Sequence, residues 1–138
     1  MKNIINVTPH VIRFQNAGNV VYEVEPCGVL VNARPIEEGA GLRLFCGYQP
    51  SECQTEHYGH CENCGYAVEL VRTRFVATPE EEEKLAVLEA ENSGAIIVGS
   101  IIAAQAFPGR VLAMVPAPGF ERVPPDQKKM RDDKFTTF

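Results

Sequence analysis

Short runs of β-branched and other apolar residues fill the first third of the chain, and turn-forming residues separate them. The runs span residues 4–7, 11–14, 20–24 and 29–31, with proline, glycine or asparagine between them. This pattern predicts a set of antiparallel strands. Within the third run apolar residues alternate with polar ones, which indicates a sheet that exposes one face to water.

Turn-forming residues and the spacing of the apolar runs indicate two hairpins. Asn16-Ala17-Gly18-Asn19 joins the second and third runs, and these residues tolerate the positive φ that a four-residue hairpin loop requires. Residues 42–45 and 66–76 form a second pair of runs on either side of a cysteine-rich segment, residues 46–64. We therefore expect the cysteine-rich segment to lie at the tip of the second hairpin.

The clearest helix signal follows the second hairpin. Thr78 is placed as an N-cap, Pro79 suits the first helical position, and Glu81 completes a T-x-x-E capping box. Acidic residues fill the first turn, where the helix dipole favours negative charge. Leu85 and Leu88 begin the stripe that we expect to be buried.

The pattern then changes to strand, helix and strand, over residues 95–98, 101–106 and 111–115. Both strands are apolar on either side, as is typical of buried strands. Residues 124–138 are rich in charge and predict an exposed arm, closed by a short strand over residues 135–138. The expected fold class is α+β: a mainly antiparallel β-sheet with two helices, a C-terminal β-α-β segment and a Cys-rich hairpin insertion.

Length and composition agree with one domain over residues 1–123, followed by a charged arm over residues 124–138. The chain has 138 residues, of which 45% are hydrophobic and 22% charged, close to the globular average. Its formal charge of −5 argues against a protein that coats nucleic acid or binds a membrane surface, because such proteins present a broad positive field.

The opening residues are too few and too polar for a signal peptide, and no run approaches the roughly 18 apolar residues of a membrane span. We therefore expect a soluble protein of the cytoplasm. Thiols are kept reduced in that compartment, so clustered cysteines are more readily explained as metal ligands than as disulfides.

The cysteine-rich segment has the composition of a zinc site. Cys61-Glu62-Asn63-Cys64-Gly65 is a C-x2-C-G knuckle, in which both thiolates reach one ion and the glycine permits the tight turn. We expect structural Zn²⁺ held by Cys46, Cys53, Cys61 and Cys64. A second set replaces Cys46 with His57, and unligated thiols in a polar loop are the other alternative.

The start of the chain resembles a known group of proteins. Ile5-Asn6-Val7-Thr8-Pro9-His10-Val11-Ile12 is similar to the I-N-L-T-P-H-x-I box that opens a group of small phage and prophage proteins. Glu25-Pro26-Cys27-Gly28 resembles the E-P-S-G turn of that group, with Cys27 in place of serine. Further similarity lies in residues 97–102 and 111–119, whereas the cysteine-rich insertion and the helix after it depart from the pattern. The resemblance implies a phage-encoded protein working in the host cytoplasm, and it implies no particular chemistry.

Two short motifs are candidates for ligand contacts. Thr8 and His10 flank Pro9 at the bend of the box, where they either satisfy backbone groups or face a ligand. Gly99 and Ser100 lie between a buried strand and a helix, where backbone N–H groups can receive an anion. The same two residues are also an ordinary helix start, with Ser100 as N-cap.

Arginines recur along the predicted strands, and convergent guanidinium groups would recognise phosphates. Arg72 and Arg74 share one face of a strand, and Arg110 precedes another. Arg13, Arg34 and Arg43 lie on other predicted strands or at their ends. The simpler interpretation of each single arginine is a solvated side chain.

These features lead to three hypotheses. The first is a non-enzymatic, homo-oligomeric protein of phage counter-defence that sequesters a small nucleotide-like signal through Thr8, His10, Arg72, Arg74, Gly99, Ser100 and Arg110. The second is a protein that binds a host protein such as RNA polymerase through the hairpin tip and the charged arm. The third is a small nucleotide-modifying enzyme that uses His10 or Cys27.

Overall fold

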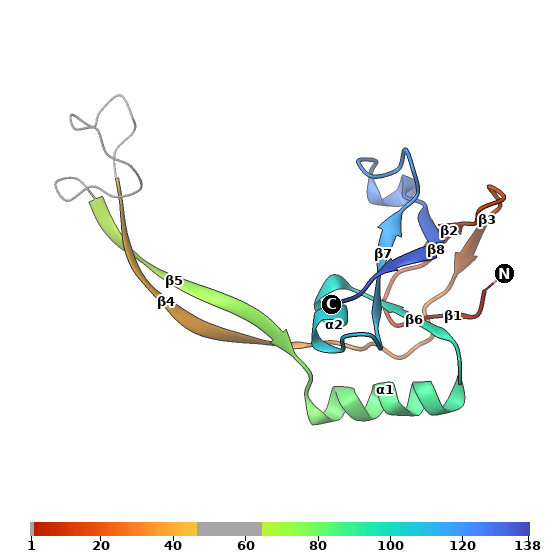
Figure 1. The fold of residues 1–138 in the computed structure, drawn as a ribbon, viewed down its shortest axis with the longest axis horizontal. Helices are drawn as coiled ribbons and strands as arrows, with labels where there is room; N and C mark the ends of the chain where they lie inside the picture. Colours follow the sequence, from red (N-terminus) through yellow and green to blue (C-terminus); the bar gives the residue numbers. More distant parts are fainter. Residues whose placement is uncertain (1, 47–64) are drawn as a thin grey trace. The chain divides into compact units, whose positions relative to one another are not determined.

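The computed structural model of the chain describes residues 2–46 and 65–138, and it shows an α+β fold with two α-helices (Figure 1). In chain order the elements are β1 (Ile4–Asn6), β2 (Ile12–Gln15), β3 (Val21–Val24), β4 (Arg34–Cys46), β5 (Gly65–Val76), α1 (Pro79–Glu91), β6 (Ile96–Gly99), α2 (Ile101–Ala106), β7 (Leu112–Pro116), the 3-10 helix η1 (Pro125–Gln127) and β8 (Met130–Thr136). The chain divides into two compact units, Met1–Arg34 with Phe75–Phe138, and Pro35–Arg74.

The first unit is built on a six-stranded sheet with the order β1-β6-β7-β8-β2-β3. The pairs β1–β6, β6–β7 and β2–β8 are parallel, and the pairs β2–β3 and β7–β8 are antiparallel. This sheet is mixed, which corrects the expectation of a mainly antiparallel sheet. The error has a physical basis, because apolar runs reveal strands but not the distant partners with which they pair.

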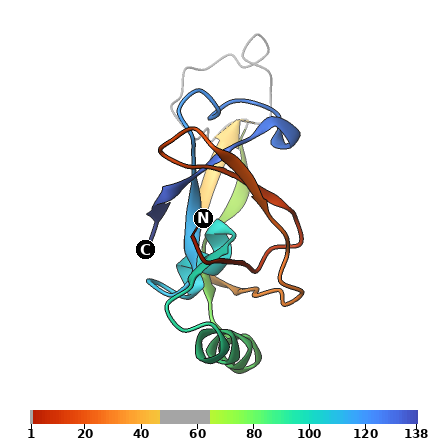
Figure 2. The ribbon, with the colours of Figure 1, turned by 90° about the vertical axis from the view of Figure 1, so that its right-hand side faces the viewer.

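The sheet curls until its two edge strands nearly meet, a curvature that can be followed in Figure 2. An isolated parallel bridge joins Asn6 at the end of β1 to Pro26 just after β3, and the N–H of Cys27 donates to the Asn6 carbonyl at 2.9 Å. This contact between the edges leaves the sheet close to a barrel, and closure protects strand edges that would otherwise attract other chains.

All six strands contribute side chains to the interior of the curled sheet. Phe14 and Val98 are fully buried there, and the Phe14 ring lies 5.9 Å from that of Tyr22 and 6.4 Å from that of Phe135, between ring centroids. The cluster consists of Ile4, Ile12, Phe14 and Val98, with Tyr22, Val24, Ile96, Met114, Met130 and Phe135 packed against them.

The two helices pack on the other face of the sheet. Leu85 and Leu88 of α1 are buried with Ala103 and Ala104 of α2, against Val111 and its neighbours. Along β6 the side chains alternate between the two clusters, since Ile97 faces the helices and Val98 faces the interior. The predicted β-α-β segment is thus confirmed.

Local sequence signals explain where α1 begins. Thr78 is the N-cap, and its hydroxyl accepts the N–H of Glu81 at 3.3 Å, as predicted. Glu81 does not complete the box in the usual way, because its carboxylate accepts the N–H of Asn32 at 2.9 Å and pairs with Lys84 at 2.8 Å. The acidic residue therefore fastens the segment before β4 to the helix.

The first predicted hairpin is confirmed. β2 and β3 are antiparallel neighbours, and Asn19 in their loop has a φ of 62°. The side chain of Asn16 accepts from the N–H groups of Gly18 and Val20, at 2.9 and 3.0 Å. The loop thus supplies its own hydrogen-bond partners where the ladder ends.

Residues 29–31, predicted as a strand, do not form one. Val31 is buried in the helix-face cluster, and its N–H donates a single long bond of 3.4 Å to the Val7 carbonyl. An apolar segment can thus be held by packing alone, without the paired ladder of a strand.

The charged segment predicted as an exposed arm contains β8, which lies inside the sheet between β7 and β2 (Figure 1). Asp132 is only 3% exposed, and its carboxylate accepts the hydroxyl of Tyr22 at 2.7 Å. Lys2 adds an ion pair to the same carboxylate at 3.6 Å. The charge-rich sequence therefore conceals a strand whose one buried acid has partners of its own.

The second unit contains a two-stranded sheet of β4 and β5, in which β5 runs back beside β4 (Figure 1). This confirms the second predicted hairpin; its cysteine-rich tip, residues 47–64, lies outside the described residues. Arg74 pairs with Glu38 across the two strands at 3.3 Å, and Leu42 is 75% exposed. Within the described ranges, no helix of either unit has the length and apolar character needed to cross a membrane.

Candidate ligand-binding pocket

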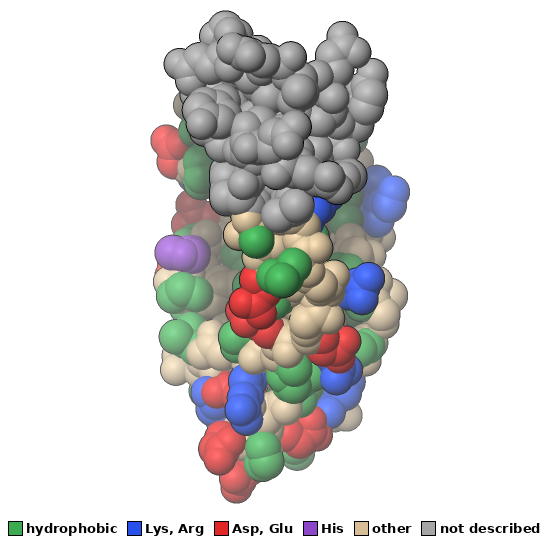
Figure 3. Space-filling view, turned by 90° about the vertical axis from the view of Figure 1, so that its left-hand side faces the viewer, with side chains coloured by type: hydrophobic (Ala, Val, Ile, Leu, Met, Phe, Trp, Pro, Cys, Tyr) green, Lys and Arg blue, Asp and Glu red, His purple; other side chains and the backbone are tan. Residues whose placement is uncertain are grey.

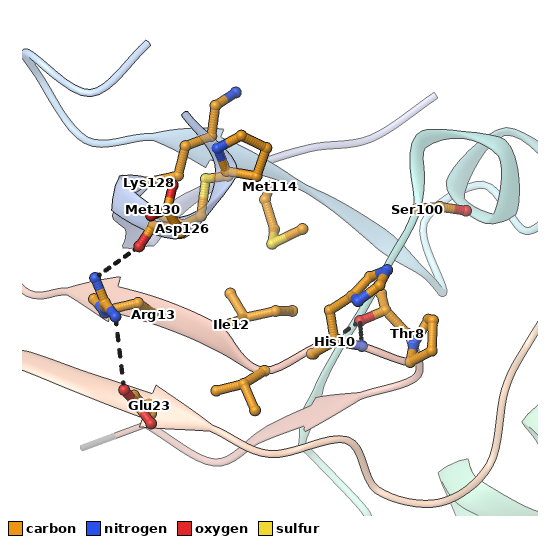
Figure 4. Close-up of a pocket in the computed structure, with 13 residues that line it drawn as sticks. Thr8, His10, Ile12, Arg13, Glu23, Ser100, Met114, Asp126, Lys128 and Met130 are labelled. Atoms are coloured by element: carbon orange, nitrogen blue, oxygen red, sulfur yellow. Dashed lines mark hydrogen bonds and ion pairs between the residues drawn. The ribbon is translucent and has the colours of Figure 1, made fainter. Parts of the chain in front are cut away.

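A cavity of about 680 Å³ opens in the first unit, a size suited to a small molecule (Figure 4). Its walls come from the bend after β1, from β2 and β3, from the start of α2 and from the segment that leads into β8. The lining residues are Thr8, Pro9, His10, Val11, Ile12, Arg13, Glu23, Ser100, Met114, Pro125, Asp126, Lys128 and Met130.

The middle of the pocket is apolar and continuous with the barrel interior. Ile12, Met114 and Met130 line the pocket and also belong to the interior cluster. Figure 4 shows these three side chains between two polar ends. The pocket is therefore the mouth of the curled sheet, a common location for ligand sites in barrels.

One polar end carries Thr8, His10 and Ser100, which the sequence singled out as candidate ligand contacts. The Thr8 hydroxyl is 2.7 Å from Asn6 Oδ1 and accepts the N–H of His10 at 3.3 Å, so it stabilises the bend as the simpler interpretation expected. The Ser100 hydroxyl caps α2 by accepting the N–H of Ala103 at 3.1 Å. His10 is exposed and its ring faces the pocket (Figure 4).

Asn6 holds this end in shape, and the sequence analysis did not identify it. Its side chain is fully buried, and its Nδ2 donates to the carbonyl oxygens of His10 at 2.6 Å and Val24 at 3.2 Å. Its Oδ1 accepts the N–H of Thr8 at 2.9 Å. The box at the start of the chain is therefore a network of hydrogen bonds organised around Asn6.

The opposite end carries two cations and two carboxylates. Arg13 Nη1 donates to the backbone carbonyl of Asp126 at 3.3 Å, and Arg13 Nη2 lies 3.9 Å from Glu23 Oε1 (Figure 4). Lys128 lines the same end, and no ion pair to it is recorded among the residues that the structure describes. Both contacts of Arg13 are long, so its guanidinium could accept a better placed anion.

Gly99 and Arg110 are not at the pocket. A Cβ on Gly99 would lie 2.7 Å from Val111 Cγ1, so the glycine serves the close packing of β6 against its neighbours. Arg110 donates to Glu89 at 2.6 Å and to Glu82 at 2.7 Å, and both carboxylates raise its pKa further above the usual range. Its cation therefore fastens α1 to the start of β7.

Arg72 and Arg74 belong to the second unit, on β5. Both are exposed, and Arg74 pairs with Glu38 of the same unit. The described contacts therefore give these two arginines a place on the two-stranded sheet, and they do not line the pocket.

The predicted zinc ligands Cys53, Cys61 and Cys64, with the alternative His57, lie outside the described residues, and the side chain of Cys46 is not described either. Among the residues that are described, no cluster of His, Cys, Asp or Glu could hold a metal ion. Cys27 is an exposed free thiol whose Sγ is 3.4 Å from the Val29 carbonyl, and it does not line the pocket.

Several pocket residues escaped the sequence analysis. Arg13 was noted as one arginine among several, and Asp126 and Lys128 were assigned to an exposed arm. No local signal marks them, because only the insertion of β8 beside β2 brings them to the pocket.

Acidic and basic side chains are interspersed on the face of the molecule drawn in Figure 3, over its described part. Comparison with known proteins found no matching protein family, no matching curated protein and no matching solved structure.

Proposed function

We propose that this chain is a non-enzymatic binding protein, encoded by a phage, that sequesters a small nucleotide-like signal molecule as part of counter-defence. The resemblance of residues 5–12 to the box of small phage proteins motivates the phage context. The pocket motivates the binding role, because its apolar middle suits a planar base and its two polar ends suit a sugar and an anionic group.

The observation that carries the proposal is the position of three groups in one cavity. His10 lies at one end, Arg13 and Lys128 lie at the other, and apolar side chains line the space between them. Guanidinium and ammonium groups are the usual partners of phosphate, and an imidazole can donate to or accept from a sugar or base. No member of this group needs to change chemically for the ligand to be held.

Isothermal titration calorimetry with a panel of nucleosides and nucleotides tests the proposal. We expect at least one compound to bind, and Arg13→Gln to weaken its binding about tenfold by removing a charged hydrogen bond. Arg122→Gln is the matched control, because Arg122 is exposed and does not line the pocket. The absence of any binding compound, or equal affinity of the wild type and Arg13→Gln, would count against the proposal.

Mass spectrometry of the ligand after denaturation separates a binding protein from an enzyme. Sequestration predicts that the ligand is recovered unchanged after long incubation. Recovery of an altered ligand, lost in His10→Ala, would favour the alternative of a small nucleotide-modifying enzyme.

A second candidate function is the binding of a host protein such as RNA polymerase. The observation that favours it is the exposure of apolar side chains on the two-stranded sheet, where Leu42 is 75% and Val71 42% exposed. Such residues often mark protein interfaces. A pull-down from a bacterial lysate that recovers a stoichiometric protein with the wild type, and not with Leu42→Asp, would support this role.

A further inference from the structure

The pocket has nearly balanced charge at its cationic end, and this limits the ligands it can hold. Arg13 and Lys128 contribute two positive charges, and Glu23 and Asp126 contribute two negative charges to the same lining. The formal sum of these four groups is zero. A site for a chain of phosphates would normally show an excess of positive charge or a bound metal ion.

One anionic group can nevertheless be accommodated at small cost. Arg13 and Glu23 are 3.9 Å apart, with side chains 39% and 55% exposed, so their ion pair is weak and easily exchanged for another. The bond from Arg13 to the Asp126 carbonyl is 3.3 Å long and also weak. A single phosphate oxygen pair would give the guanidinium a better acceptor while leaving Lys128 beside it.

Further negative charges would meet the two carboxylates instead. Coulomb repulsion grows with the number of charges on the ligand, and it is screened only in part inside a pocket. The opposite end offers no compensation, because Thr8 and Ser100 are neutral hydroxyls already engaged in the bend and the helix cap.

We propose that the pocket selects nucleotides bearing a single negative charge, such as a phosphodiester, and rejects nucleoside diphosphates and triphosphates. This inference rests on the proposed binding of a nucleotide-like ligand and specifies its charge. Glu23 and Asp126 act as the selective elements, since they match the two cations until one ligand anion displaces Glu23 from Arg13.

Calorimetry with adenosine, cyclic AMP, AMP and ADP tests the inference, because the four probes share one base and differ in charge. We expect cyclic AMP to bind at least about tenfold more tightly than ADP. In Glu23→Gln the affinity for ADP should rise about eightfold and that for cyclic AMP about twofold, since the relief of repulsion scales with ligand charge. Glu25→Gln is the matched control, because Glu25 is exposed and lies outside the pocket lining.

The outcomes separate the two proposals. If ADP binds as tightly as cyclic AMP and its binding depends on Arg13, the proposed function stands and the charge limit is overturned. An unchanged preference in Glu23→Gln, with an unaltered melting temperature, overturns the role of that carboxylate. If none of the probes binds, both proposals lose their support together.

Discussion

The side-chain amide of Asn6 donates a hydrogen bond of 2.6 Å to the carbonyl oxygen of His10, four residues further along the chain. The bond fixes the bend that carries His10 to the pocket. Because Asn6 is fully buried, its amide has no water to replace the partners that the bend provides.

Replacement of Asn6 by alanine should therefore be costly. Asn6→Ala removes the partners of two carbonyl oxygens and of the Thr8 N–H, and we expect the free energy of unfolding to fall by about 3 kcal/mol. Urea denaturation followed by circular dichroism measures the change. Asn16→Ala, in the exposed hairpin loop, is the comparison and should cost only about 1 kcal/mol. Equal losses in the two variants would contradict the role given to Asn6.

Gly99→Ala should destabilise the fold by about 2 kcal/mol, because the new Cβ would overpack the contact with Val111. Combining it with Val111→Ala should recover part of this loss, so that the double variant is more stable than the sum of the single effects predicts. Gly39→Ala meets no atom within 4 Å and should be nearly neutral. Strict additivity of Gly99→Ala and Val111→Ala would refute the packing explanation.

Arg110→Ala should lower stability and leave ligand binding unchanged. Its pairs with Glu82 and Glu89 are geometrically good but partly exposed, with an Arg110 side chain 34% exposed, so we expect a loss of about 1 kcal/mol. Thermal denaturation measures the stability and calorimetry the affinity. A large fall in ligand affinity without a fall in stability would return Arg110 to the binding site.

The stability of the fold should decline at alkaline pH because of Tyr22. Desolvation by burial, together with the hydrogen bond to Asp132, raises the pKa of Tyr22 from 10.0 to about 12. The folded state therefore holds the phenolic proton more tightly than the unfolded chain, and the resulting stability is complete below pH 10.0 and is lost as the pH rises towards about 12. Tyr22→Phe should remove this part of the decline in denaturation curves. A decline of the same size in that variant would contradict the assignment.

The zinc site of residues 46–64 stays a prediction. Elemental analysis and native mass spectrometry should find one zinc ion per chain, and Cys61→Ser should lose it, whereas Cys27→Ser should keep it. Comparing Cys46→Ser with His57→Ala distinguishes the two ligand sets, since only the true ligand should weaken zinc binding when it is replaced. Metal-free wild-type protein, prepared with zinc present throughout, would exclude the site.

Features governed by neighbouring residues could be predicted from the sequence. The start of α1 follows from Thr78 and Pro79, and the first hairpin follows from Asn16 and Asn19, because each of these residues acts on the backbone beside it. The β-α-β segment was predictable for a similar reason, since its apolar runs alternate with a short capped helix.

Features governed by distant partners could not be predicted. The charges around Asp132 suggested solvent exposure, yet Tyr22 and Lys2, far away in the sequence, supply the partners that allow its burial. The pocket shows the same limit: Thr8, His10 and Ser100 were candidates from their motifs. Arg13 and Lys128 join them only through the order of the strands.

The position of β8 also bears on how the protein emerges from the ribosome. β8 is the last strand to be made, but its place is between β7 and β2. Until it is synthesised, the nascent chain exposes two open strand edges, and such edges are templates for aggregation. Closure of the barrel must therefore wait for translation of the segment that bears Asp132, and a pause before that segment would prolong the most vulnerable stage of the chain's life.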